Sequence, residues 1–131
     1  MNDKPRAQMV DISDIIEKTV TSIDVNMDES RIVLNCVGYK YTMMHNQDCC
    51  EQVYIESING DASDFINQNV LEASESTGHI DTEWDDELAE WTFYNIVCNK
   101  GYLQIRFNGS SNGYYSVGVD VIRESINEGS I

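Results

Sequence analysis

The densest group of reactive side chains is the segment 45–51, which reads His-Asn-Gln-Asp-Cys-Cys-Glu. Imidazole, thiolate and carboxylate groups all bind metal ions, so one hypothesis is a metal-binding protein. Its ligands would be His45, Asp48, Cys49 and Cys50. Neighbouring side chains on a strand diverge, however, so two adjacent thiols rarely reach one ion. We therefore expect free, buried cysteines beside a hydrogen-bonded histidine, and no metal or cofactor.

The same thiols next to His45 also contain the groups of a nucleophile and its base. The sequence shows no third residue to orient them, and it contains no serine-nucleophile elbow, phosphate-binding loop or His-Glu-x-x-His motif. It therefore predicts a protein that is not an enzyme.

The distribution of charge is the second feature. The chain has 131 residues, with 23 Asp and Glu against 8 Lys and Arg, and a formal net charge of −15. Between Lys40 and Lys100 there is no Lys or Arg, whereas 13 residues are Asp or Glu. This charge repels phosphates, so direct binding to nucleic acid is not expected. Two interpretations stay open: a solvated face that keeps the protein soluble, and an anionic surface that binds a basic partner.

The acidic residues are densest in the segment 76–90, which we expect to be a loop. Alternate carboxylates of an extended chain lie roughly 6–7 Å apart on one side, a spacing suited to replacing phosphates in a basic groove. Trp84 either adds an apolar anchor to such a surface or pins the loop to the sheet. The candidate partner-binding residues are Asp81, Glu83, Trp84, Asp85, Asp86, Glu87 and Glu90.

Aromatic and basic residues gather in the last third of the chain. Trp91 and Phe93 are part of this group, and aromatic rings can stack on a nucleobase, so a nucleotide-binding or nucleotide-sequestering protein is an alternative function. Its candidate ligand-binding residues are Arg106, Tyr114 and Tyr115, with Lys100 and Arg123 in the same third of the chain. Packing of the rings in a core explains the same residues.

The residue patterns predict mostly strands. Runs rich in β-branched and aromatic residues, separated by turns with Gly and Asn, are typical of strands joined by hairpins. The predicted strands are 19–25, 31–36, 39–44, 52–58, 70–75, 91–98, 102–107 and 114–122, and short helices are predicted at 11–18 and 61–66. The expected fold class is β-rich α+β, a mostly antiparallel sheet of six to eight strands in a meander of hairpins with one or two short helices.

The length is typical of one domain. We expect a loose N-terminal tail at 1–10, a single domain at 11–123 that contains the acidic loop 76–90, and a loose C-terminal tail at 124–131. No run of about 18 apolar residues is present, and the N-terminus lacks the apolar core of a signal peptide. No membrane span is therefore expected, and the expected location is cytoplasmic.

Three motifs carry a resemblance to a known family. They are Asp48-Cys-Cys-Glu51 within the segment 41–61, Trp91-Thr-Phe-Tyr94, and Asn112-Gly-Tyr-Tyr-Ser116. In these motifs the chain, over roughly residues 10–122, resembles a family of small uncharacterised phage and prophage proteins, a domain of unknown function. The resemblance implies a phage origin and a small β-rich fold, and it supplies no catalytic residues.

Charge and resemblance together favour a non-enzymatic phage accessory protein. Its expected partner is a basic host protein that binds nucleic acid, which it inhibits as a nucleic-acid mimic and possible anti-defence inhibitor in the host cytoplasm. The nucleotide-binding and metal-binding proteins described above are the alternatives.

Overall fold

The computed structural model of the chain describes residues 7–47, 50–81, 87–113 and 116–126. Within these residues the protein consists of nine strands and two short 3-10 helices, and every strand pair is antiparallel. The strands are β1 (Ala7–Val10), β2 (Thr19–Asn26), β3 (Arg31–Cys36), β4 (Tyr39–Met44), β5 (Gln52–Gly60), β6 (Gln68–His79), β7 (Leu88–Cys98), β8 (Gly101–Ser111) and β9 (Asp120–Ser125). The helices are η1 (Ile12–Ile15) and η2 (Ala62–Phe65).

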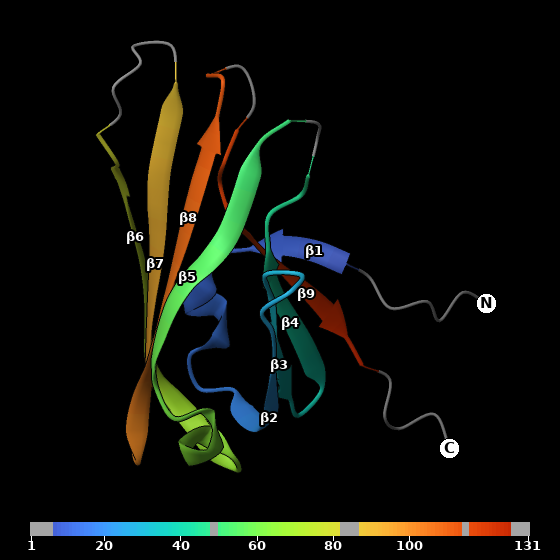
Figure 1. The fold of residues 1–131 in the computed structure, drawn as a ribbon. Coiled ribbons are helices and arrows are strands. Elements are labelled where there is room, and N and C mark those ends of the chain that lie inside the picture. The colour runs from blue at the N-terminus through green and yellow to red at the C-terminus, as the bar shows by residue number, and fades with distance from the viewer. Residues whose placement is uncertain (1–6, 48–49, 82–86, 114–115, 127–131) are drawn as a thin grey trace, which may run out of the picture.

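The strands form one sheet in the order β1-β9-β4-β3-β2-β6-β7-β8-β5. The junction of β2 and β6 is only two residue pairs long, with Thr19 opposite Asn69 and Val20 opposite Gln68. At this junction the sheet divides into two layers, with η1 between them (Figure 1). We call β1, β9, β4, β3 and β2 the first layer, and β6, β7, β8 and β5 the second layer.

The core lies between the two layers because alternate residues of the strands are apolar. In the first layer Ile32 and Leu34 are fully buried while their neighbours are only partly covered. In the second layer the rings of Tyr94 and Phe107 meet edge to face, with 6.2 Å between their centroids. Ile15 of η1 is also fully buried and belongs to the same core. This burial of apolar surface is the main contribution to the stability of the fold.

The predicted fold class is confirmed, with nine strands in the described residues where six to eight were expected. The predicted helix at 11–18 is only the four-residue η1, which ends before the extended residue Ile16, and the next residue, Glu17, has a positive φ of 72°. So short a helix gains little from its own hydrogen bonds and depends on the burial of Ile12 and Ile15. The helical turn predicted at 61–66 is η2, and the Asp61 carboxylate accepts a hydrogen bond from the Ser63 N–H at 2.9 Å.

Several strands are longer than the sequence indicated. β1 lies within the expected N-terminal tail and pairs with β9, with Ala7 opposite Glu124, so strand structure extends into both expected tails. β6 continues to His79 and β7 begins at Leu88, both inside the segment expected to be an acidic loop. Cross-strand pairing therefore extends strands through polar residues, because each added pair satisfies backbone hydrogen-bonding groups.

The last connection is not the predicted hairpin. β8 continues to Ser111, through most of the turn expected at 108–113, and β9 pairs with β4 and β1 in the first layer. Residues 116–119 of the strand predicted at 114–122 are not strand. This crossover buries Val121 opposite Met43. In the described part of the chain, no helix is long and apolar enough to cross a membrane.

Candidate functional site

His45 and Glu51 of the predicted metal-binding segment are hydrogen-bonded to each other. His45 Nε2 lies 2.7 Å from Glu51 Oε2, and His45 Nδ1 lies 2.6 Å from the carbonyl oxygen of Gly118. A carbonyl oxygen only accepts, so Nδ1 donates and Nε2 faces the carboxylate. The side chains of His45 and Glu51 are 8% and 0% exposed. Through its two ring nitrogens, His45 thus links the segment before β5 to the segment before β9. Both nitrogens already have a hydrogen-bond partner.

The thiols do not add a metal site in the described residues. Asp48 and Cys49 lie outside the described residues, and Cys50 is disulfide-bonded, contrary to the expectation of free cysteines in this segment. Among the residues that the structure describes, no three His, Cys, Asp or Glu side chains are grouped so that they could hold a metal ion. Cys36 and Cys98 are free and buried.

Neither of these free thiols has the surroundings of a nucleophile. Burial raises the pKa of Cys36 to about 11, against a smaller opposite effect of Lys18. The Cys98 thiol donates a hydrogen bond to the carbonyl oxygen of Asp64 at 3.4 Å. The Cys36 thiol therefore stays protonated at neutral pH, which makes it a poor nucleophile and a poor metal ligand.

The predicted partner-binding residues are partly described. Glu83, Trp84, Asp85 and Asp86 lie outside the described residues. Asp81 and Glu87 are exposed and flank that segment, and Glu90 on β7 lies 3.7 Å from His79. Two further exposed carboxylates, Glu72 and Glu75, lie on β6. We call Glu72, Glu75, Asp81 and Glu87 the acidic margin.

The acidic margin lies along an open edge of the sheet. Beyond Val70, whose backbone groups bond to Glu17 and Lys18, β6 pairs with β7 alone among the described strands. Figure 1 shows β6 as the outermost strand on the side of the second layer away from β5. The side chains of the margin and one backbone edge are therefore accessible to a partner.

Three of the positive charges in the described residues are ion-paired away from the acidic margin. The ion pairs of Lys and Arg are Arg31–Glu29, Lys40–Glu124 and Arg123–Asp14. All of them join residues of the first layer, of the turn between β2 and β3, or of η1. Within the described residues, no Lys or Arg forms an ion pair with the acidic margin. The charge of the margin is therefore not neutralised locally.

The central carboxylates do not form one continuous surface. Glu51 is buried with His45. Asp61 and Asp64 lie at η2, at the end of the second layer opposite the connection from β6 to β7 (Figure 1). The acidic margin is thus one of several anionic regions, distinguished by its position on the sheet edge.

The residues proposed for nucleotide binding are separated. Arg106 lies on β8 and its guanidinium stacks over the Trp91 ring, 5.7 Å from the ring centroid. Arg123 is on β9 in the first layer and Lys100 is in the turn between β7 and β8. Tyr114 and Tyr115 lie outside the described residues. The three cations of this third of the chain therefore do not form one phosphate-binding cluster.

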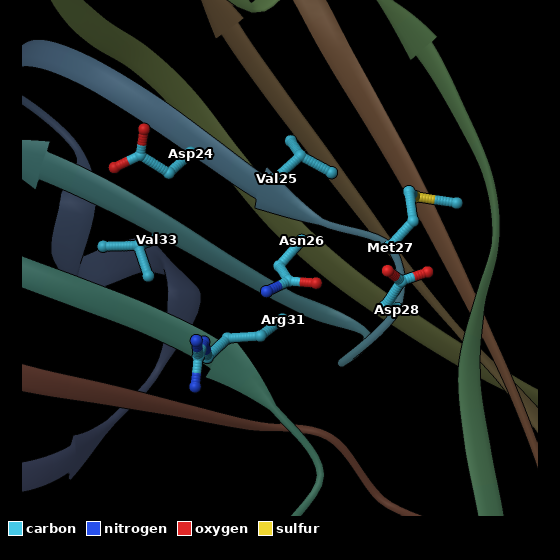
Figure 2. Close-up of a pocket in the computed structure, with 7 residues that line it drawn as sticks. All are labelled: Asp24, Val25, Asn26, Met27, Asp28, Arg31 and Val33. Atoms are coloured by element: carbon cyan, nitrogen blue, oxygen red, sulfur yellow. The ribbon is translucent and has the colours of Figure 1, made fainter.

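An open groove of about 640 Å³ lies at the end of the β2–β3 hairpin. Figure 2 shows that Asp24, Asn26 and Arg31 line it together with the exposed Met27. Arg31 donates to Glu29 at 2.6 Å, and Asn26 donates to the same carboxylate oxygen at 2.9 Å. Asn26 and Arg31, two of the polar residues that line the groove, are thus engaged in holding the turn.

A partly buried polar network that the sequence did not indicate lies at η1. Tyr41 Oη donates to Asp14 Oδ2 at 2.7 Å, and Arg123 Nη1 donates to the same oxygen at 2.9 Å. Arg123 also donates to Gln8 at 2.9 Å. These residues come from four distant segments, so no local motif could have revealed them. They connect β1, η1, β4 and β9, and we interpret their role as structural.

Comparison with known proteins identifies a family. A family model described as a domain of unknown function, DUF7448, matches residues 13–121. No curated protein and no solved structure matches the chain.

Proposed function

Because the chain belongs to the DUF7448 family, whose function is unknown, its role must be inferred from its own geometry, and we propose that it is a non-enzymatic protein that binds a basic partner through the acidic margin. The partner class is a protein that binds nucleic acid, because such proteins carry grooves lined by Lys and Arg. Occupation of that groove inhibits the partner. If the chain is encoded by a phage, the partner is a host protein, such as a component of host defence.

One observation carries this proposal. The acidic margin forms no ion pair with Lys or Arg of the described chain, although Arg31, Lys40 and Arg123 are all ion-paired in or beside the first layer. Unneutralised carboxylates on an edge strand produce a local negative potential, which attracts a basic surface over about a Debye length of 8 Å. The proposal therefore requires that cations come from another molecule.

The chemistry of the described chain is consistent with binding without catalysis. His45 is occupied by Glu51 and Gly118, and burial keeps the Cys36 thiol protonated. Neither group has the accessible, activated geometry of a catalytic base or nucleophile. The acidic margin itself offers charge and an open strand edge, which are means of recognition.

The test is capture of the partner from a host extract on immobilised protein, followed by competition. We expect the captured protein to be released by duplex DNA, and its affinity to fall by at least tenfold between about 50 mM and 200 mM salt. A second elution with an uncharged polymer of equal mass measures release by crowding alone. A captured protein that resists duplex DNA, or binding that does not change with salt, would refute the proposal.

Charge-matched variants locate the surface. The first combines Glu72→Gln, Glu75→Gln and Glu87→Gln in the acidic margin. The control combines Asp11→Asn, Asp24→Asn and Asp28→Asn, which removes the same charge from η1 and the β2–β3 hairpin. We expect the first variant to lose at least tenfold in affinity while the control stays within threefold of the parent. Equal losses of affinity in the two variants would show that the net charge of the protein, and not the acidic margin, determines binding.

A further inference from the structure

The outer face of the second layer has a composition unlike the rest of the molecule. Strand register places Trp91 opposite Asn108, Phe93 opposite Arg106, and Asn95 opposite Gln104. The alternate residues of the same strands, such as Tyr94 and Phe107, are buried in the core, so these pairs face away from it. On β5, Tyr54 lies opposite Asn108 and is 47% exposed. We call Tyr54, Trp91, Asn95, Gln104, Arg106 and Asn108 the amide–aromatic face.

The side chains of this face are held in place by one another. A Cβ at Gly78 would overlap the Trp91 indole, so the ring lies directly on the backbone of β6. The Arg106 guanidinium lies over the Trp91 ring, 5.7 Å from the ring centroid, and its Nε donates to Asn108 Oδ1 at 2.9 Å. Gln104 donates to Asn95 Oδ1 at 3.4 Å. The face is thus preorganised, which lowers the entropic cost of binding a ligand.

Polar atoms of the same side chains remain available. Within the described chain, the amide nitrogens of Asn95 and Asn108 and the side-chain carbonyl oxygen of Gln104 have no hydrogen-bond partner. They offer donors and an acceptor between the exposed ring of Tyr54 and the partly exposed indole of Trp91. Strand spacing of about 4.8 Å places the backbones of β5 and β7, which carry these two rings, roughly 10 Å apart. A ligand that contacts both rings and also bonds to the amide atoms between them is elongated and carries both apolar surfaces and hydroxyl groups.

The charge of the face selects among such ligands. The outward positions of β7 and β8, at 91, 93, 95 and 97 and at 102, 104, 106 and 108, hold no Asp or Glu, although the chain carries 23 of them. Their one cation, Arg106, is engaged with Trp91 and Asn108. The net charge of −15 opposes the approach of polyanions such as nucleic acids. The complementary ligand is therefore uncharged.

We infer that the amide–aromatic face binds a neutral carbohydrate chain. The C–H faces of sugar rings stack on the exposed Tyr54 ring, whose face is negative, and pack against the part of the Trp91 indole that Gly78 and Arg106 leave uncovered. Sugar hydroxyls bond to the available amide atoms of Asn95, Gln104 and Asn108, because hydroxyl groups both donate and accept. This site lies on the sheet face and uses none of the carboxylates of the acidic margin. A test of carbohydrate binding at this site is therefore independent of a test of the proposed function.

The experiment titrates the protein with four neutral hexasaccharides, built from glucose in β- and in α-linkage, from mannose and from N-acetylglucosamine. Binding is followed by calorimetry and by the fluorescence of Trp91 in a Trp84→Phe background, which leaves one tryptophan. We expect at least one sugar to bind with a Kd below about 1 mM, a typical affinity for a small ligand on an open face. We also expect this affinity to stay the same between low and high salt, because the ligand has no charge.

Variants assign the binding to the face. Trp91→Ala should abolish binding, and Asn108→Ala should weaken it by about tenfold, the equivalent of one lost hydrogen bond. Tyr54→Ala provides a second ring variant at a more exposed position, in case Trp91→Ala does not fold. Met9→Ala, at an exposed position on β1, is the control and should leave the affinity unchanged.

Three results would overturn the inference. The first is no binding of any of the four sugars at 10 mM, roughly the limit of a specific site. The second is binding that persists in folded Trp91→Ala and Tyr54→Ala. The third is tighter binding of ATP or of an oligothymidylate than of every sugar, which would assign the face to a nucleotide or a single-stranded nucleic acid.

Discussion

Glu51 Oε2 lies 2.7 Å from Nε2 of His45, and the opposite ring nitrogen of His45 lies 2.6 Å from the carbonyl oxygen of Gly118. One imidazole thus bridges two connections that are 73 residues apart in sequence, one leading into β5 and the other into β9. The carboxylate has no exposed side-chain surface, so the pair is shielded from water and from salt.

The first prediction concerns that pair. His45→Ala removes one partner of a buried hydrogen-bonded pair and should lower the free energy of unfolding by about 1–3 kcal/mol. Lys40→Ala removes one partner of the exposed Lys40–Glu124 pair and should cost at most about 1 kcal/mol. Urea unfolding followed by circular dichroism measures both. A cost below about 1 kcal/mol for His45→Ala would mean that the bridge contributes no more than a surface pair.

The second prediction is a pH dependence that originates at Asp14. Burial alone would raise its pKa, but hydrogen bonds from Tyr41 and Arg123 outweigh burial and hold the pKa below the ordinary value of 3.8. A carboxyl whose pKa is lower in the folded state stabilises the fold above its unfolded pKa, and this contribution is lost as pH falls through the folded pKa. The free energy of unfolding should therefore fall below about pH 4.

In Asp14→Asn, the part of the stability loss at low pH that comes from Asp14 should disappear, because an asparagine side chain does not titrate. Asp28→Asn, in the exposed β2–β3 turn, should retain it. Urea midpoints measured between pH 2 and pH 6, roughly two units either side of the ordinary value, separate the two variants. Parallel curves for the parent and Asp14→Asn would contradict the assignment.

The third prediction concerns Cys36. Burial raises its pKa to about 11, so at pH 8 about one thiol in a thousand is ionised. Alkylation by iodoacetamide in the folded protein should therefore be at least about 100-fold slower than in urea. The control is Val37→Cys in a Cys36→Ser background. This variant places the thiol at the next residue of the chain, where Val37 is 59% exposed. Mass spectrometry of the labelled peptides gives both rates, and equal rates in the folded protein would exclude the burial effect.

The fourth prediction concerns Gly78, on which the Trp91 indole lies. Gly78→Ala places a methyl group into the indole, so it should cost about 1–3 kcal/mol and shift the Trp91 emission to longer wavelength. Gly118→Ala is the control, because a Cβ there meets only Ser116 Oγ at 3.5 Å. It should stay within about 0.5 kcal/mol of the parent. An unchanged emission spectrum in Gly78→Ala would show that the indole has room to move.

The strands whose signal is local were predictable. The segments 31–36 and 91–98 alternate buried and less buried residues, and these segments and 39–44 are each a strand in the structure. The turn at Asn99 and Lys100 was also predictable, because these two polar residues separate two runs of strand-forming residues. These elements are confirmed because the signal, alternation and turn residues, acts within a few residues.

The arrangement of the strands was not predictable in the same way. A turn after β8 favours a hairpin locally, yet β9 crosses to the first layer, where Val121 packs opposite Met43. The choice depends on which layer offers an unfilled apolar position, a property of the whole fold. The same holds for the site: Trp91 and Phe93 were weighed as core residues, but register with β8 turns both outward, away from Tyr94.

The pairing of β1 with β9 has a practical consequence for every binding measurement suggested above. Ala7 and Glu124 lie opposite each other on β1, the outermost strand of the first layer, and on its neighbour β9, remote from β7 and β8 (Figure 1). A tether attached through either end of the described chain therefore orients the molecule with both proposed recognition surfaces toward the solution. Sensor-based assays in the two orientations should give the same affinity, which makes their agreement a check for surface artefacts.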